Sequence, residues 1–123
     1  MVGGQAAVLV VDDESSIRLL CKVNLELEGY RVLEAARLDA AREALETEPI
    51  GVVLLDVHVG PDDGRTLLDE LRVERPGVRV ALFSGTTEVD AIAHLGADAL
   101  IPKPFTLDQL TETVARLASS ARV

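Results

Sequence analysis

Three acids, one serine and one lysine follow short apolar segments of this 123-residue sequence. The acids are Asp12, Asp13 and Asp56, and the other two residues are Ser84 and Lys103. Carboxylates that crowd together repel one another, and a hard divalent cation with oxygen ligands relieves that repulsion. We therefore expect a Mg²⁺ site. An aspartate oxygen there could attack phosphorus and form an acyl phosphate, while the metal neutralises the transferring oxygens.

The five residues suggest a division of labour. Asp56 closes a continuous apolar segment, which makes it the best-placed nucleophile. Lys103 would supply a positive charge to the phosphoryl oxygens, and Ser84 a hydroxyl donor whose partner exists only after transfer. Each residue alone also has an ordinary structural interpretation, as a turn acid, a helix cap or an exposed loop lysine. The presence of all five residues after predicted strands favours the chemical interpretation.

The segments that must position these residues alternate between short apolar runs and stretches of helical period. The predicted strands cover residues 6–11, 31–35, 51–55, 78–83 and 99–101. This alternation is typical of an α/β fold, with a parallel sheet covered by helices on both faces. Ligands of such sheets bind beyond the carboxyl ends of the strands. All five chemical residues should therefore meet at one rim, and the mixed run 31–35 should be an edge strand.

Composition excludes several classes of function. The net charge is −9 and the cationic residues are scattered, so we expect no direct nucleic-acid binding. No apolar run approaches the length of a membrane-spanning helix, and the first residues lack the pattern of a signal peptide. The single cysteine, Cys21, is expected to be a small buried hydrophobe in a reducing cytoplasm. We expect one domain over residues 1–123, ordered from about 6 to 118, without an effector domain.

Five motifs together resemble the receiver domains of two-component signal transduction, over nearly the whole chain. They are residues 8–11 with Asp12-Asp13-Glu14, Asp56 with Gly64 eight residues later, Phe83-Ser84-Gly85, Gly96-Ala97-Asp98 and Pro102-Lys103-Pro104-Phe105. The resemblance implies a flavodoxin-like, doubly wound parallel sheet of five strands in the order 2-1-3-4-5.

The resemblance also implies a role for each matching position. Asp12 and Asp13 correspond to the metal-site acids, Asp56 to the phosphoacceptor, Ser84 to the switch hydroxyl and Lys103 to the phosphoryl-binding lysine. The backbone carbonyl of His58 would complete the metal shell, with its side chain at the entry to the site. A cis Lys103–Pro104 bond is a further implication.

By the same resemblance, the phosphoryl donor is a phosphohistidine on a sensor histidine kinase or a histidine phosphotransfer protein. Output would be made by protein contact. The chain would then catalyse only its own phosphorylation and dephosphorylation, as a monomer or weak homodimer.

Two departures from the family pattern leave other interpretations open. Leu100 stands where receivers usually carry an aromatic residue or histidine, and residues 84–96 form a stretch about three residues short, which predicts a short fourth helix. A phosphorylation-independent interaction module or a passive phosphate sink would fit these departures. A haloacid-dehalogenase-type phosphatase fits less well, because its motif needs an aspartate where Glu14 stands and no cap domain is present.

Overall fold

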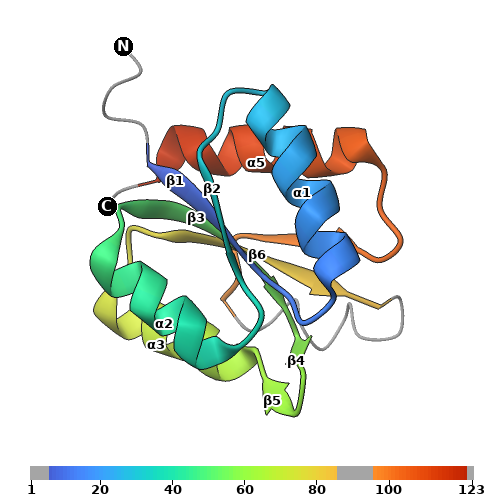
Figure 1. The fold of residues 1–123 in the computed structure, drawn as a ribbon. Helices are drawn as coiled ribbons and strands as arrows, with labels where there is room; N and C mark the ends of the chain where they lie inside the picture. Colours follow the sequence, from blue (N-terminus) through green and yellow to red (C-terminus); the bar gives the residue numbers. More distant parts are fainter. Residues whose placement is uncertain (1–5, 86–95, 122–123) are drawn as a thin grey trace.

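A five-stranded parallel sheet forms the centre of the protein (Figure 1). The computed structural model describes residues 6–85 and 96–121. The strands are β1 (Ala7–Val11), β2 (Val32–Ala35), β3 (Ile50–Asp56), β6 (Arg79–Ser84) and β7 (Ala99–Pro102). They lie in the order β2-β1-β3-β6-β7, and every neighbouring pair is parallel. The predicted α/β sheet of order 2-1-3-4-5 is therefore confirmed, with the second strand at an edge.

Helices cover both faces of this sheet (Figure 1). They are α1 (Ser15–Leu27), α2 (Leu38–Thr47), α3 (Arg65–Glu74) and α5 (Leu107–Ser120). Side chains of α1 and α5 share one buried cluster with one face of the strands, and those of α2 and α3 share another with the opposite face. The sheet is thus doubly wound, as predicted. Within the described ranges, none of the helices has the length and apolar character that crossing a bilayer requires.

The local sequence explains these elements. All residues of β1 are buried, as a strand covered on both faces requires. Cys21 and Leu25 are the buried residues of α1, four positions apart on one helical face, and the prediction of a buried Cys21 is confirmed. At the start of α5, the Thr106 hydroxyl accepts from the Gln109 N–H at 3.0 Å, and the Gln109 side chain accepts from the Thr106 N–H at 2.7 Å. This reciprocal capping box fixes where α5 begins.

One element was not predicted. A short antiparallel hairpin of β4 (His58–Val59) and β5 (Asp62–Asp63) follows the carboxyl end of β3. Its two-residue turn contains Gly60, whose φ of +59° favours glycine. The prediction of a short fourth helix concerns the stretch 84–96, of which residues 86–95 lie outside the described residues.

Candidate functional site

The carboxyl ends of two adjacent central strands bring the three acids together. Asp12 directly follows β1, and Asp56 ends β3. One oxygen from each of Asp12, Asp13 and Asp56 lies within 4.8 Å of the others. Asp12 is fully buried, Asp56 is partly buried and Asp13 is exposed, so the cluster opens to solvent on one side. These oxygens are the ligands that a hard divalent cation prefers, so the residues fit a metal site.

The Lys103 ammonium reaches this cluster from the loop after β7. Its Nζ donates to Asp12 Oδ2 at 2.9 Å and to Asp56 Oδ2 at 3.3 Å. The backbone N–H of Lys103 donates to the Ser84 carbonyl at 2.8 Å, which ties the loop to the end of β6. The Lys103–Pro104 bond is cis, as the family resemblance implies. Lys103 therefore stands as a cation between two of the three acids.

Ser84 contributes a buried hydroxyl to the same rim. Asp56 pairs with Phe83 in the β3–β6 register, so Ser84 is one residue further along the neighbouring strand. Ser84 is only 3% exposed, and among the described residues its Oγ has no hydrogen-bond partner. A buried polar atom without a partner costs roughly 1–3 kcal/mol, and such atoms are uncommon in folded proteins. The hydroxyl is thus available to a ligand that carries an acceptor oxygen.

Burial and charge together set the proton affinities of the cluster. Burial, and then the neighbouring Asp12 carboxylate, raises the pKa of Asp56 above its usual range, against the opposing effect of Lys103. Burial alone would lower the pKa of Lys103, but its hydrogen bonds and charge contacts with Asp12 and Asp56 outweigh burial and raise it. One ammonium therefore offsets the crowded acids only in part. An added cation would favour the ionised form of Asp56.

Gly64 allows α3 to start close to the acid. A Cβ at Gly64 would lie 2.0 Å from the Asp56 carbonyl oxygen. The Gly64 N–H also donates to the Val57 carbonyl at 2.7 Å, which closes the loop that carries the hairpin. No side chain fits at this position without moving the backbone of Asp56. The Asp56–Gly64 spacing noted in the sequence therefore has a steric cause.

His58 and Leu100 occupy the positions that the sequence singled out, with different outcomes. The His58 N–H donates to Asp56 Oδ1 at 3.4 Å and its side chain is exposed. That its carbonyl is a metal ligand stays a prediction. Leu100 is partly buried and packs against the core under α2 and α3. An inward-facing aliphatic side chain thus fills the position of the family's aromatic.

Two groups of supporting contacts, around Arg18 and around Phe83, were missed by sequence reasoning. The Arg18 guanidinium donates to the Asp12 carbonyl at 2.7 Å and to Glu34 Oε1 at 3.1 Å, which ties α1 and β2 to the loop of the acids. The rings of Phe83 and Phe105 stack with centroids 5.4 Å apart, and Lys103 Nζ lies 5.4 Å from the Phe83 centroid. Both phenylalanines stand in motifs already noted. No local pattern pairs Arg18 with Glu34, because they are 16 residues apart.

Comparisons with known proteins agree with this geometry. Residues 8–115 match the sequence profile of the response regulator receiver domain. The chain is 38% identical over 121 residues to the sensor kinase CckA of Brucella abortus (strain 2308), and the match covers 94% of this chain and 13% of that protein. It is 31% identical over 112 residues to sporulation initiation phosphotransferase F of Bacillus subtilis (strain 168), with 89% and 90% covered.

The solved receiver domain of NtrX from Brucella abortus has a TM-score of 0.86 and 32% sequence identity to this chain, and the alignment covers 93% of this chain and 99% of that one. The chain spans 13% of CckA and 26% of the Pseudomonas putida regulator AlgB, so it corresponds to one part of those longer relatives. Fold, motif positions and relatives lead to the same conclusion. The chain belongs to the response regulator receiver domain family.

Proposed function

We propose that Asp56 of this receiver domain accepts a phosphoryl group from a phosphohistidine, with Mg²⁺ held by Asp12, Asp13 and Asp56. The observation that carries the proposal is the juxtaposition of three carboxylates within 4.8 Å with the Lys103 ammonium 3.3 Å from Asp56 Oδ2. The donor would be a sensor histidine kinase or a histidine phosphotransfer protein in the cytoplasm. The chain would catalyse only its own phosphorylation and dephosphorylation.

Each residue has a definite part in the transfer. An Asp56 carboxylate oxygen attacks phosphorus, the phosphorus–nitrogen bond breaks, and the imidazole leaves with the electron pair. Lys103 then binds a phosphoryl oxygen from its position beside Asp56. The Ser84 hydroxyl, buried and unpartnered among the described residues, donates to another. Mg²⁺, when bound, would neutralise the transferring oxygens and align them with the nucleophile.

The direct test is acyl-phosphate formation with phosphoramidate in the presence of Mg²⁺. We expect one hydroxylamine-sensitive phosphoryl group per chain, detected by intact mass and located on Asp56. Asp56→Ala and chelation of Mg²⁺ should both abolish it. Asp39→Asn, which removes an exposed acid of α2, should leave labelling unchanged. Labelling that persists in Asp56→Ala would overturn the assignment.

An apolar surface on α1 suits the donor protein. Leu19, Val23 and Leu27 are exposed and repeat every four residues, so they share one face of the helix. This face continues into a groove that α1 shares with the loop of Lys103, the residue whose ammonium contacts Asp12 and Asp56. We expect a helical phosphodonor to cover it, because a helix packs well on such a stripe and brings its histidine to Asp56.

The docking surface can be tested apart from the chemistry. Val23→Asp should leave phosphoramidate labelling unchanged but reduce transfer from a phosphorylated sensor kinase roughly tenfold or more. Val73→Asp, on the exposed side of α3, is the matched control. Equal transfer to both variants would contradict the surface. Loss of a concentration-dependent dimer in Val23→Asp would instead assign it to a second copy of the chain.

A phosphoryl carrier is the second candidate, favoured by Leu100 at the position of the family's aromatic. A relative that this chain matches over most of its length is named a phosphotransferase. A switch and a carrier differ in how far from Asp56 phosphorylation changes the structure. A phosphoryl mimic that shifts amide resonances between Ser84 and Leu100 supports a switch, whereas shifts confined to the loops of the acids support a carrier.

A further inference from the structure

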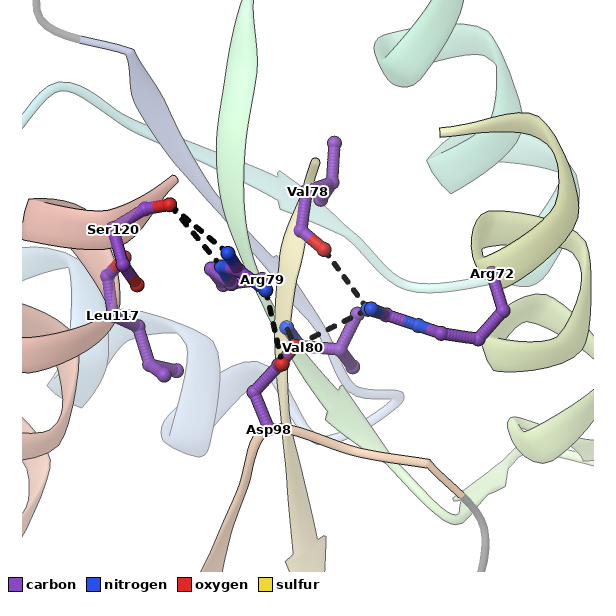
Figure 2. Close-up of polar contacts among 7 residues, drawn as sticks. All are labelled: Arg72, Val78, Arg79, Val80, Asp98, Leu117 and Ser120. Atoms are coloured by element: carbon purple, nitrogen blue, oxygen red, sulfur yellow. Dashed lines mark hydrogen bonds and ion pairs between the residues drawn. The ribbon is translucent and has the colours of Figure 1, made fainter. Parts of the chain in front are cut away.

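An ion-pair cluster lies at the amino ends of β6 and β7, opposite the rim that holds Asp56. Its centre is the Asp98 carboxylate, directly before β7, and Figure 2 shows two guanidinium groups beside it. Arg72 of α3 donates to Asp98 Oδ2 at 3.2 Å, and Arg79 at the start of β6 donates to Asp98 Oδ1 at 3.4 Å. Nothing in the proposed phosphoryl transfer uses this cluster.

The same carboxylate also extends the hydrogen-bond ladder between β6 and β7. The Val80 N–H donates to Asp98 Oδ2 at 2.8 Å, and the Asp98 N–H donates to the Val80 carbonyl at 2.8 Å. Asp98 is therefore bonded to one residue of β6 through both its backbone and its side chain. This reciprocal pair stands one step before the first register pair of the two strands, Ala81 with Ala99.

β7 needs such a fixed point because the strand alone specifies its register weakly. It is an edge strand of four residues that pairs with β6 alone among the described strands; Ile101 is its one fully buried residue, and the other three are partly buried. Register is strongly set where a strand buries one complete face, and weakly where it does not. A slip of one residue would move every following residue by about 3.3 Å.

That displacement would fall on the phosphoryl-binding groups. Ser84 ends β6 and pairs with Pro102 of β7, and the next residue, Lys103, bonds to the Ser84 carbonyl. The Lys103 ammonium contacts Asp12 at 2.9 Å and Asp56 at 3.3 Å, and a shift of about 3.3 Å would break both contacts. The acids themselves would not move, because they stand at the ends of β1 and β3.

We propose that Asp98 is a positioning residue for phosphoryl binding: its bond to the Val80 N–H fixes β7 against β6 and thereby places Lys103 beside Asp56. The proposal rests on the proposed function for the role of Lys103. The arginines orient the carboxylate: Arg72 also donates to the Val78 carbonyl at 2.9 Å, and Arg79 to the Ser120 carbonyl at 3.2 Å (Figure 2). They hold the cluster together but make no ladder bond.

Two conservative variants separate the ladder bond from the charge. Asp98→Asn keeps an acceptor oxygen for the Val80 N–H and loses the charge. Asp98→Glu keeps the charge for Arg72 and Arg79 but moves the oxygens one methylene away from the ladder. We expect Asp98→Glu to weaken beryllofluoride binding, measured with saturating Mg²⁺, about five- to tenfold, and Asp98→Asn to change it less than about twofold. Mg²⁺ affinity alone should not fall in either variant, because the acids keep their places and displacement of Lys103 removes a positive charge beside them.

The outcomes that overturn the proposal are distinct. If Asp98→Asn weakens beryllofluoride binding as much as Asp98→Glu, the charge and not the ladder bond is responsible. If the affinities for Mg²⁺ and beryllofluoride fall together, Asp98 only stabilises the fold. Arg42→Met, which breaks an ion pair between α2 and α3, is the control for a general loss of stability and should change neither affinity.

Amide hydrogen exchange at Lys103 tests the register without any ligand, because its N–H is bonded to the Ser84 carbonyl. We expect faster exchange in Asp98→Glu than in the wild type and in Asp98→Asn. Unchanged exchange in Asp98→Glu would overturn the register claim even if phosphorylation at Asp56 is established. Conversely, a wild-type chain that forms no acyl phosphate would refute the proposed function while this measurement still decides the register.

Discussion

At the scale of single residues, we expect the Ser84 hydroxyl to lower the free energy of unfolding and to strengthen phosphoryl binding. Its oxygen is buried without a partner among the described residues, so its removal relieves an unmet hydrogen bond. We expect Ser84→Ala to leave the free energy of unfolding unchanged or raise it by about 1 kcal/mol, because unsatisfied buried groups are destabilising. Beryllofluoride affinity should fall roughly tenfold with the lost donor. Urea unfolding measures the free energy, and titration with beryllofluoride in the presence of Mg²⁺ measures the affinity.

A second hydroxyl provides the control for Ser84. Thr106 Oγ1 accepts from the Gln109 N–H at 3.0 Å, so it already has its partner. Thr106→Ala should lower the free energy of unfolding by about 1 kcal/mol and leave mimic affinity unchanged. A loss of stability in Ser84→Ala as large as in Thr106→Ala would contradict the assignment of an unpartnered oxygen.

Cys21 makes stability depend on alkaline pH. Burial, and then the Asp12 charge, raises the pKa of the Cys21 thiol from 9.0 to about 12. In the unfolded chain the thiol ionises near its ordinary value, so the unfolded state releases the proton first. Stability is therefore lost as pH rises from about 9 towards 12, by at most about 1.4 kcal/mol per pH unit. When the wild type and Cys21→Ala are unfolded by urea at several pH values between about 9 and 12, the free energy of unfolding should fall less steeply with pH in the variant. An equal dependence on pH in the two proteins would show that burial does not raise the pKa of the thiol.

At the scale of secondary-structure elements, the start of α3 limits where Asp56 can lie. A methyl group at Gly64 would meet the Asp56 carbonyl oxygen at 2.0 Å, so either α3 or the end of β3 must move. We expect Gly64→Ala to lower the free energy of unfolding by about 2 kcal/mol or more and to slow labelling by phosphoramidate. Gly85→Ala is the matched control, because a Cβ there would have no neighbour within 4 Å among residues 6–85 and 96–121. Equal stability of the two variants would contradict the close approach.

The elements also show how far sequence reasoning reaches. Continuous apolar runs predict the central strands because a strand covered on both faces must be apolar throughout, and β1 and β3 follow that rule. The acids, the serine and the lysine were found because strand ends share one rim. The β4–β5 hairpin was not, because each strand has only two residues and no alternation can be read from them.

Contacts between distant parts of the chain account for the rest. Arg18 supports Asp12 through its backbone carbonyl, a group that every residue type carries and no sequence pattern reveals. Asp98 was noted as part of a motif, yet its contact with Val80 depends on where β7 lies against β6. The Asp56–Gly64 spacing was visible as a resemblance, and only the structure supplies its steric reason.

At the scale of the whole molecule, charge works against folding. The chain carries a net charge of −9, and three of its acids meet at one rim of the sheet. Repulsion between like charges destabilises the compact state, and dissolved salt screens it. Lys103 offsets part of this repulsion, since it contacts Asp12 and Asp56. A divalent cation can therefore act in two ways, as general screening or as a ligand of the cluster.

The two actions can be separated by comparing salts at equal ionic strength. We expect MgCl₂ to raise the melting temperature of the wild type above the value in NaCl, because a ligand of the folded state adds about 1.4 kcal/mol of stability for each tenfold increase in free concentration above its dissociation constant. NaCl only screens the repulsion between the acidic side chains.

The variant Asp13→Asn shows whether the cluster is the binding site. Without Mg²⁺, Asp13→Asn should be more stable than the wild type, because it removes one of three crowded charges while the exposed side chain leaves no cavity. The melting temperature in MgCl₂ should exceed that in NaCl by less in this variant than in the wild type, or not at all. An equal advantage in both proteins would mean that Mg²⁺ acts on the net charge of the molecule and not on the acids at the end of β1 and β3.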